Sequence, residues 1–142
     1  MKYNFEIGKS FAGINFDISI KKAIKQLGKP VRTYKDNLGI SLFYDNIGLV
    51  LSYEKENEKL IDLGIQTEKL VYEGKNWYDY KKKEIFKIIK TIYKRKKYNF
   101  GFDVTTMKIL NEKQYDFYEI GVSLFFNKNK LTNIIVSKPI ID

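Results

Sequence analysis

The sequence of 142 residues contains no cysteine and no histidine. Without cysteine the chain has no disulfide and no thiolate nucleophile, and without either residue it lacks the usual ligands of zinc. The commonest acid/base group at neutral pH, the imidazole, is also missing. Most familiar classes of active site are therefore excluded, and we expect no catalytic residue, no metal site and no cofactor.

Long apolar segments are lacking as well. The first residues, MKYNFEIGKSFAG, are interrupted by polar and charged side chains, so they do not form the apolar stretch of a secretory signal. No apolar run approaches the roughly 18 residues of a membrane-spanning helix. We therefore expect a cytoplasmic protein without a membrane partner. The length suits one domain, residues 1–142, that buries a core without cross-links.

Arginine is scarce although the net charge is +9. Of the 26 basic residues only Arg32 and Arg95 are arginines. Bidentate recognition of bases and phosphates favours the guanidinium group, so the charge alone does not indicate specific nucleic-acid binding. The sequence is also rich in lysine, isoleucine, asparagine and tyrosine, which have A- and T-rich codons, so part of the lysine excess can reflect genome composition. The charge is nevertheless uneven, because residues 75–98 hold ten basic and two acidic side chains.

Two segments have the pattern of amphipathic helices. Residues 19–27 begin with Ser19 as a cap and end before Gly28, with Pro30 just beyond. The segment YKKKEIFKIIKTIYKRKK, residues 80–97, predicts a longer helix with a basic, solvated face. Its apolar stripe consists of Ile85, Ile88, Ile89 and Ile92, widened by Phe86 and Tyr93.

The remaining apolar segments alternate as strands do. Residues 4–7 and 13–18 flank a Gly-Lys-Ser turn and predict an N-terminal hairpin. Strands are expected at 31–34, 40–44, 49–53 and 59–66 after the first helix, and at 104–110, 115–119, 122–126 and 131–137 after the second. The predicted fold is α+β, with two tandem helix-then-antiparallel-strand units and both helices packed on one face of the sheet.

A weak internal repeat supports the two units. When Ile47-Gly48 is aligned with Ile120-Gly121, the residues Leu49, Leu51 and Tyr53 fall opposite Val122, Leu124 and Phe126, and Leu60 falls opposite Leu131. We therefore expect pseudo-repeats at about 13–73 and 74–142.

Strand alternation assigns the side chains to two faces. One set is apolar and should pack under the helices: Ile40, Leu42, Tyr44, Leu49, Leu51, Tyr53, Ile61, Leu63 and Ile65. The other set is mostly polar with a few aromatics: Ser41, Phe43, Val50, Ser52, Asp62, Gln66, Ser123 and Phe125. Such a composition suits an exposed protein-binding surface.

The run INFDISIKKAIKQLGKP, followed by YDNIGLVLSYE and EKLIDLGI, resembles the helix-plus-three-strand module of the small bacterial outer-membrane assembly lipoproteins. Tandem use of such modules resembles the β-lactamase inhibitor proteins, and similar small sequences occur among bacterial toxin-immunity proteins. The chain has no cysteine to carry a lipid. The resemblance implies a rigid sheet that serves as a docking surface.

The first functional hypothesis is a non-enzymatic bacterial immunity or inhibitor protein that neutralises a cognate toxin by direct binding. Immunity proteins to nuclease toxins are commonly acidic, so a basic chain suits an acidic partner surface or a toxin of another kind. The residues expected to bind the partner are the anchors Phe43, Phe125, Trp77, Tyr78 and Tyr80, with Lys94 and Arg95 for electrostatic steering.

The alternative hypothesis is a nucleic-acid-binding protein that uses the basic helix 81–97. Its binding face comprises Lys83, Lys87, Lys90, Lys94 and Lys97, flanked by aromatic side chains at Trp77, Tyr78, Tyr80 and Tyr98. A metal-dependent enzyme is a third possibility, for which the nearest fragment is Glu73-Gly74-Lys75 with Asp62 upstream. Gly74 in its centre favours a turn over a catalytic strand.

Overall fold

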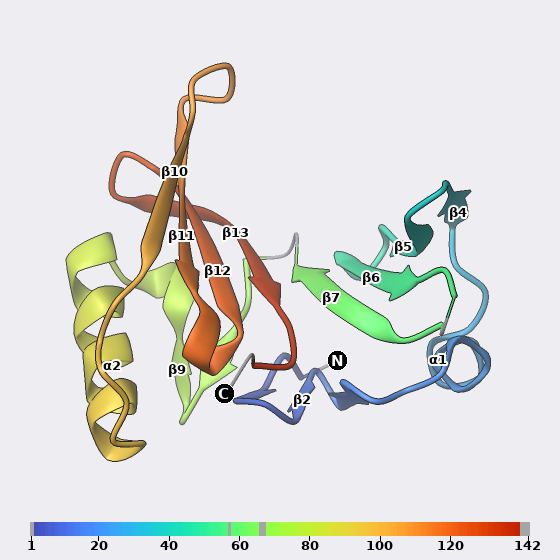
Figure 1. Ribbon diagram of the computed structural model, residues 1–142, viewed down its shortest axis with the longest axis horizontal. Coiled ribbons are helices and arrows are strands. Elements are labelled where there is room, and N and C mark those ends of the chain that lie inside the picture. The colour runs from blue at the N-terminus through green and yellow to red at the C-terminus, as the bar shows by residue number, and fades with distance from the viewer. Residues whose placement is uncertain (1, 57, 66–67, 140–142) are drawn as a thin grey trace.

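The computed structural model describes residues 2–56, 58–65 and 68–139, apart from the side chain of Ile61. Within these residues it contains two α-helices, an eight-stranded antiparallel sheet and a small N-terminal sheet (Figure 1). The predicted α+β class, with both helices on one face of the sheet, is confirmed.

Both predicted helices are present, and α2 ends at Arg95, two residues before the predicted end at Lys97. Helix α1 spans Ile20–Leu27; the Oγ atom of Ser19 accepts a hydrogen bond of 3.2 Å from the backbone of Lys22, and Gly28 ends the helix at φ +88°. Helix α2 spans Lys82–Arg95, and the carboxylate of Glu84 accepts a 3.1 Å bond from the backbone N–H of Lys81. The buried side chains of α2, Ile85, Ile89, Ile92 and Tyr93, all belong to the predicted apolar stripe, whereas in α1 Ala23 is buried and Ile24 is 37% exposed.

The large sheet is built from two four-stranded meanders. Its strand order is β10-β11-β12-β13-β7-β6-β5-β4, so the last strand of each meander pairs with the last strand of the other. The first meander comprises β4 (Arg32–Lys35), β5 (Gly39–Tyr44), β6 (Leu49–Glu54) and β7 (Leu60–Ile65). The second comprises β10 (Asp103–Met107), β11 (Glu112–Phe117), β12 (Val122–Asn127) and β13 (Lys130–Val136).

Strand register confirms the alignment of the repeat. Tyr53 pairs with Leu60 after a bulge in β7, and Phe126 pairs with Leu131 after a bulge at the matching place in β13. Between β13 and β7, Ile135 pairs with Gly64, and these two positions are equivalent in the repeat. The two meanders are therefore related by a pseudo-twofold axis that passes between Ile135 and Gly64.

The hydrophobic core lies on one side of the large sheet. The small N-terminal sheet, formed by β1 (Phe5–Glu6), β2 (Ser10–Phe11) and β3 (Ile14–Asn15), covers this side together with the two helices. The hairpin of β8 (Val71–Tyr72) and β9 (Lys75–Asn76) leads through the 3-10 helix η1 (Trp77–Asp79) into α2. Figure 1 also shows the large sheet bent where β13 meets β7, with the covering elements outside the bend.

Alternation assigned the core face correctly. The side chains buried there include Leu42, Tyr44, Leu49, Leu51, Tyr53, Leu63 and Ile65, and Ile40 packs half-buried against them. The side chain of Ile61 and the residue Gln66, which were also assigned to faces, lie outside the described part of the chain.

Some predicted strands need correction. The N-terminal segment is a three-stranded sheet and not a hairpin, because Ser10 and Phe11 form a middle strand that pairs on both sides. The strand predicted at 104–110 ends at Met107, because the chain turns at residues 108–111. The strand predicted at 115–119 gives way after Phe117 to the 3-10 helix η2 (Tyr118–Ile120).

Candidate functional site

The side of the large sheet that faces away from the helices is left uncovered by the described residues, and we call it the open face. Strand register places one row of side chains across all eight strands of this face. In order from β10 to β4 the row is Asp103, Asp116, Ser123, Ile135, Gly64, Val50, Phe43 and Arg32. With strands about 4.8 Å apart the row is about 34 Å long, and six-residue strands are about 20 Å long. A face of this size matches one side of a standard protein interface.

The centre of the open face is apolar and separate from the core. Val50, Phe43, Phe125 and Ile135 are half-buried, yet they pack outside the hydrophobic core that lies under the helices. Polar neighbours such as Ser123 surround them. This mixture of apolar and small polar side chains is typical of the centre of a protein interface.

The two halves of the row occupy equivalent backbone positions, but the side chains at its two ends have opposite charges. The pseudo-twofold axis relates Arg32 to Asp103 and Phe43 to Asp116, because each pair occupies equivalent positions in the two meanders. One end of the row is therefore basic and the other acidic, with apolar side chains between them. A ligand that lies along the row has a preferred direction.

The acidic end is held in place by hydrogen bonds. The Oδ1 atom of Asp116 accepts bonds from Ser123 Oγ at 2.5 Å and from Gln114 Nε2 at 2.9 Å. Because of these two bonds, the carboxylate of Asp116 is preorganised to receive a basic group.

A second carboxyl group of the open face, that of Asp62, lies towards the middle of the sheet, and burial raises its pKa above its usual range.

The basic end is also preorganised. The guanidinium carbon of Arg32 lies 4.0 Å from the ring centroid of Phe43, and its Nε atom lies 3.3 Å from Asp45 Oδ2. Tyr34, two residues further along β4, is 59% exposed on the same face. Arginine and tyrosine are enriched among residues that dominate binding energy at interfaces.

Of the five predicted anchors, the fold places two on the open face. Phe43 lies on β5 and Phe125 on β12, four strand spacings away along the sheet. The expectation for Trp77 is wrong, because its side chain is fully buried between Phe5 and Tyr72 in the core. A tryptophan with no exposed surface cannot contact a partner.

The other two anchors lie elsewhere. Tyr78 and Tyr80 are half-buried against the core at the start of α2, and not on the open face. Burial raises the pKa of Tyr78 above its ordinary value, mainly because the phenolate would lose its hydration. Their environment indicates a role in packing η1 against the sheet.

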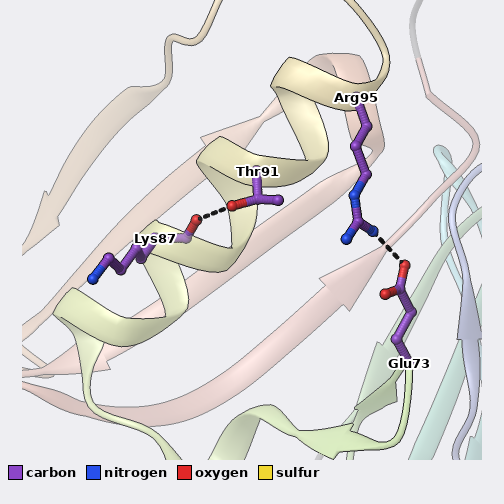
Figure 2. A network of polar contacts seen from close by, with 4 residues as sticks. All are labelled: Glu73, Lys87, Thr91 and Arg95. Atoms are coloured by element: carbon purple, nitrogen blue, oxygen red, sulfur yellow. Dashed lines mark hydrogen bonds and ion pairs between the residues drawn. The ribbon is translucent and has the colours of Figure 1, made fainter.

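The predicted steering residues, Lys94 and Arg95, are exposed at the end of α2, on the covered side of the sheet. As Figure 2 shows, the guanidinium group of Arg95 points to the β8–β9 turn, where its Nη1 atom donates a 2.7 Å bond to the carboxylate of Glu73. Lys87 extends away from this pair. The fold therefore does not bring Lys94 and Arg95 together with Phe43 and Phe125.

The lysines of the alternative face divide into two groups. Lys83, Lys87 and Lys90 line a hollow of about 630 Å³ beside α2, together with Phe86, Phe100 and Phe102. Lys94 lies beyond this hollow. Lys97 falls after the helix in a left-handed conformation, at φ +59°, so its placement on a helix face is wrong.

The fragment proposed for metal chemistry is a tight turn. Glu73 and Gly74 join β8 to β9 with φ values of +48° and +79°, as a two-residue hairpin turn requires. The carboxylate of Glu73 binds Arg95. In the part of the chain that the structure describes, no three acidic side chains gather to hold a metal ion, and no helix is long and apolar enough to cross a membrane.

Sequence reasoning missed several residues of these surfaces. Alternation could have placed Arg32, Tyr34 and Asp116 on one phase of their strands, but not in one row, since pairing between distant strands is not encoded locally. Phe100 and Phe102 follow the basic helix in a segment without a strand or helix pattern. In the structure the segment after α2 folds back along the helix, and this places Phe100 and Phe102 beside the lysines of α2.

Comparison with known proteins gives one match. The model of a protein family described as a domain of unknown function (DUF7738) matches residues 12–108. No curated protein and no solved structure matches the chain.

Proposed function

We propose that this chain, which belongs to the DUF7738 family, is a non-enzymatic protein-binding module that uses its open face. The observation that carries the proposal is the row from Arg32 to Asp103, which crosses eight strands and changes from basic through apolar to acidic. Packing of the core does not account for this order, because none of the side chains in the row belongs to the hydrophobic core.

The open face indicates the chemistry of its partner. A complementary surface presents a carboxylate to Arg32, apolar side chains to Phe43 and Ile135, and a basic group to Asp116. The face lies on the inner side of the bend in the sheet, so the partner surface is convex. Two copies of the chain would meet concave face to concave face and bury little area, which favours a different protein as the partner.

The specific function that we propose is neutralisation of a bacterial toxin by an immunity or inhibitor protein. A rigid eight-stranded sheet loses little conformational entropy on binding, and this favours the tight association that a neutralising protein needs. Both ends of the row are preorganised, by Phe43 under Arg32 and by Ser123 beside Asp116. In this proposal the open face covers the toxin by direct contact, without catalysis.

Binding by alanine variants tests the proposal. The partner is first captured from native lysate and identified, and the affinity of the purified pair is then measured by calorimetry. Phe43→Ala is expected to weaken binding by about 30-fold or more, the loss of about 2 kcal/mol that defines a hot spot. Co-expression with the toxin is expected to protect cells with the wild-type protein and to fail with Phe43→Ala.

Phe100→Ala is the matched control, because Phe100 is an aromatic side chain that is 37% exposed beside α2. It should leave the affinity for the partner unchanged. Equal affinity of Phe43→Ala and wild type would overturn the proposal. A homodimer in light scattering that Phe43→Ala dissociates would also overturn it, since the open face would then bind a second copy.

A further inference from the structure

A second surface, on the covered side of the sheet, has a different chemistry. The hollow beside α2 adjoins another of about 480 Å³ at the β10–β11 hairpin, and the two share Lys82 and Asn129 in their walls. We call the two together the α2 groove. The two hollows therefore lie next to each other, one beside the helix and one at the hairpin.

The floor of the first hollow is aromatic. Phe100 and Phe102 are 37% and 39% exposed, and their ring centroids lie 5.7 Å apart. Phe86 supports Phe102 from below in an edge-to-face contact at 5.3 Å. The planes of the two rings are tilted by 67° to each other, so they offer two separate, partly exposed surfaces on which planar groups can stack.

The rim of the α2 groove is basic. It is lined by one acidic residue, Glu112, and by seven lysines: Lys82, Lys83, Lys87, Lys90, Lys108, Lys113 and Lys128. Two of them already lie over aromatic rings, with Lys82 Nζ 4.7 Å from the centroid of Tyr115 and Lys90 Nζ 5.3 Å from that of Phe100. The ion pairs found among the described residues involve none of the seven. Their charge is therefore available to an anionic ligand.

Spacing favours an extended ligand. Lys82 and Lys90 are eight residues apart in α2, or about 12 Å along the helix axis. The lysines of the hairpin prolong the basic path beyond Lys82. A ligand that offers a repeated negative charge and a repeated planar ring along its length matches both the rim and the floor.

We propose that the α2 groove binds single-stranded nucleic acid, with its lysines on the phosphates and bases stacked on Phe100 and Phe102. A duplex would hide its bases and leave the two rings unused. An acidic peptide would satisfy the lysines but offers no regular series of rings. No arginine lines the groove, so the commonest specific contact to a base, that of arginine with guanine, is missing, and we expect little dependence on sequence.

Fluorescence anisotropy with labelled oligonucleotides of about 12 nucleotides tests this inference. Oligothymidine and oligouridine should both bind the full chain, and the logarithm of affinity should fall with the logarithm of salt with a slope of about −2 to −3, as expected for three or four phosphate contacts. A duplex of the same length should bind more weakly. Preference for the DNA or the RNA probe would identify which strand is the ligand.

Two kinds of variant separate the contribution of lysine charge from that of aromatic stacking to oligonucleotide binding. Lys83→Glu with Lys87→Glu should weaken binding and should also make the dependence of affinity on salt less steep. Phe100→Leu with Phe102→Leu keeps apolar packing but removes the rings, and should lower affinity about tenfold or more at an unchanged slope. Ultraviolet cross-linking of the wild-type protein to oligothymidine should map to Phe100 or Phe102, which tests the contact without any substitution.

The control variant carries the same charge change at another place. Lys21→Glu with Lys25→Glu alters two exposed lysines of α1 and should affect binding far less than the α2 variant. Equal effects of the two would overturn the inference in favour of a general effect of net charge. Tighter binding of the duplex, or of polyglutamate, would overturn it too. Phe43→Ala should leave oligonucleotide binding intact, so this inference and the proposed function can fail separately.

Discussion

At the scale of single residues, the buried tyrosines differ in whether their hydroxyl groups have hydrogen-bond partners. The hydroxyl of Tyr93 donates to Glu119 Oε1 at 2.6 Å, and that of Tyr44 donates to the backbone oxygen of Gly28 at 2.9 Å. The hydroxyl of Tyr53 is buried without a partner among the described residues, and burial raises its pKa to about 12. An unsatisfied buried hydroxyl lowers stability.

Replacing Tyr53 by phenylalanine is therefore expected to stabilise the protein. In the second meander the equivalent position is already occupied by a phenylalanine, Phe126. Removing the unpaired hydroxyl should increase the free energy of unfolding by about 1 kcal/mol, or about 3 °C in melting temperature by circular dichroism.

Tyr93→Phe is the control for this prediction, because its hydroxyl is bonded to a carboxylate. It should lower the free energy of unfolding by about 1–2 kcal/mol. A decrease in stability for Tyr53→Phe as well would show that the hydroxyl of Tyr53 has a favourable contact.

At the scale of elements, comparison of the two repeats identifies a glycine that is needed in the turn before β12. Gly48 and Gly121 occupy equivalent places with φ values of +68° and +67°. A Cβ atom on Gly121 would meet the backbone oxygen of Ser137 at 2.1 Å. Both the left-handed conformation and the close approach of the following chain therefore require glycine.

Gly121→Ala should destabilise the protein far more than Gly74→Ala. Gly74 also has a positive φ, +79°, but a Cβ atom there would have no neighbour within 4 Å. We expect a loss of about 1–2 kcal/mol for Gly74→Ala from backbone strain alone, and a larger loss for Gly121→Ala because the chain must also move. Urea unfolding of the two variants measures both losses, and equal values would contradict the role of Ser137.

Elements with local signals were predictable, and those without were not. The cap Ser19 and the stop Gly28 define α1 within the sequence itself. At the β10–β11 turn, however, Ile109 and Leu110 are apolar but 99% and 61% exposed, so apolar character alone extended the predicted strand too far. Periodicity describes which side chains can share a face, and it does not determine where a chain turns.

At the scale of the whole molecule, the two meanders share one sheet and one core. The β13–β7 pairing joins them, and Trp77 lies at the junction of the two halves, in contact with Phe5 of the N-terminal sheet. Because Trp77 is the single tryptophan, its fluorescence reports on this junction. The prediction of one domain across residues 1–142 can therefore be tested by its cooperativity.

Unfolding in urea should give one transition. The fluorescence of Trp77 and the far-ultraviolet circular dichroism of the helices should change at the same midpoint, since a two-state domain loses all its structure together. Separate midpoints for the two signals would mean that one half unfolds on its own, and would contradict the single domain.

The sequence by itself determined the class of the fold, both helices, the core face of the strands and the presence of a repeat, because caps, periods and alternation are local properties of the chain. Only the tertiary structure decided that β13 pairs with β7, that Arg32 and Asp103 end one row, and that Phe100 and Phe102 lie beside the lysines of α2. These contacts join residues distant in the chain, and their register depends on the free energy of packing the whole core.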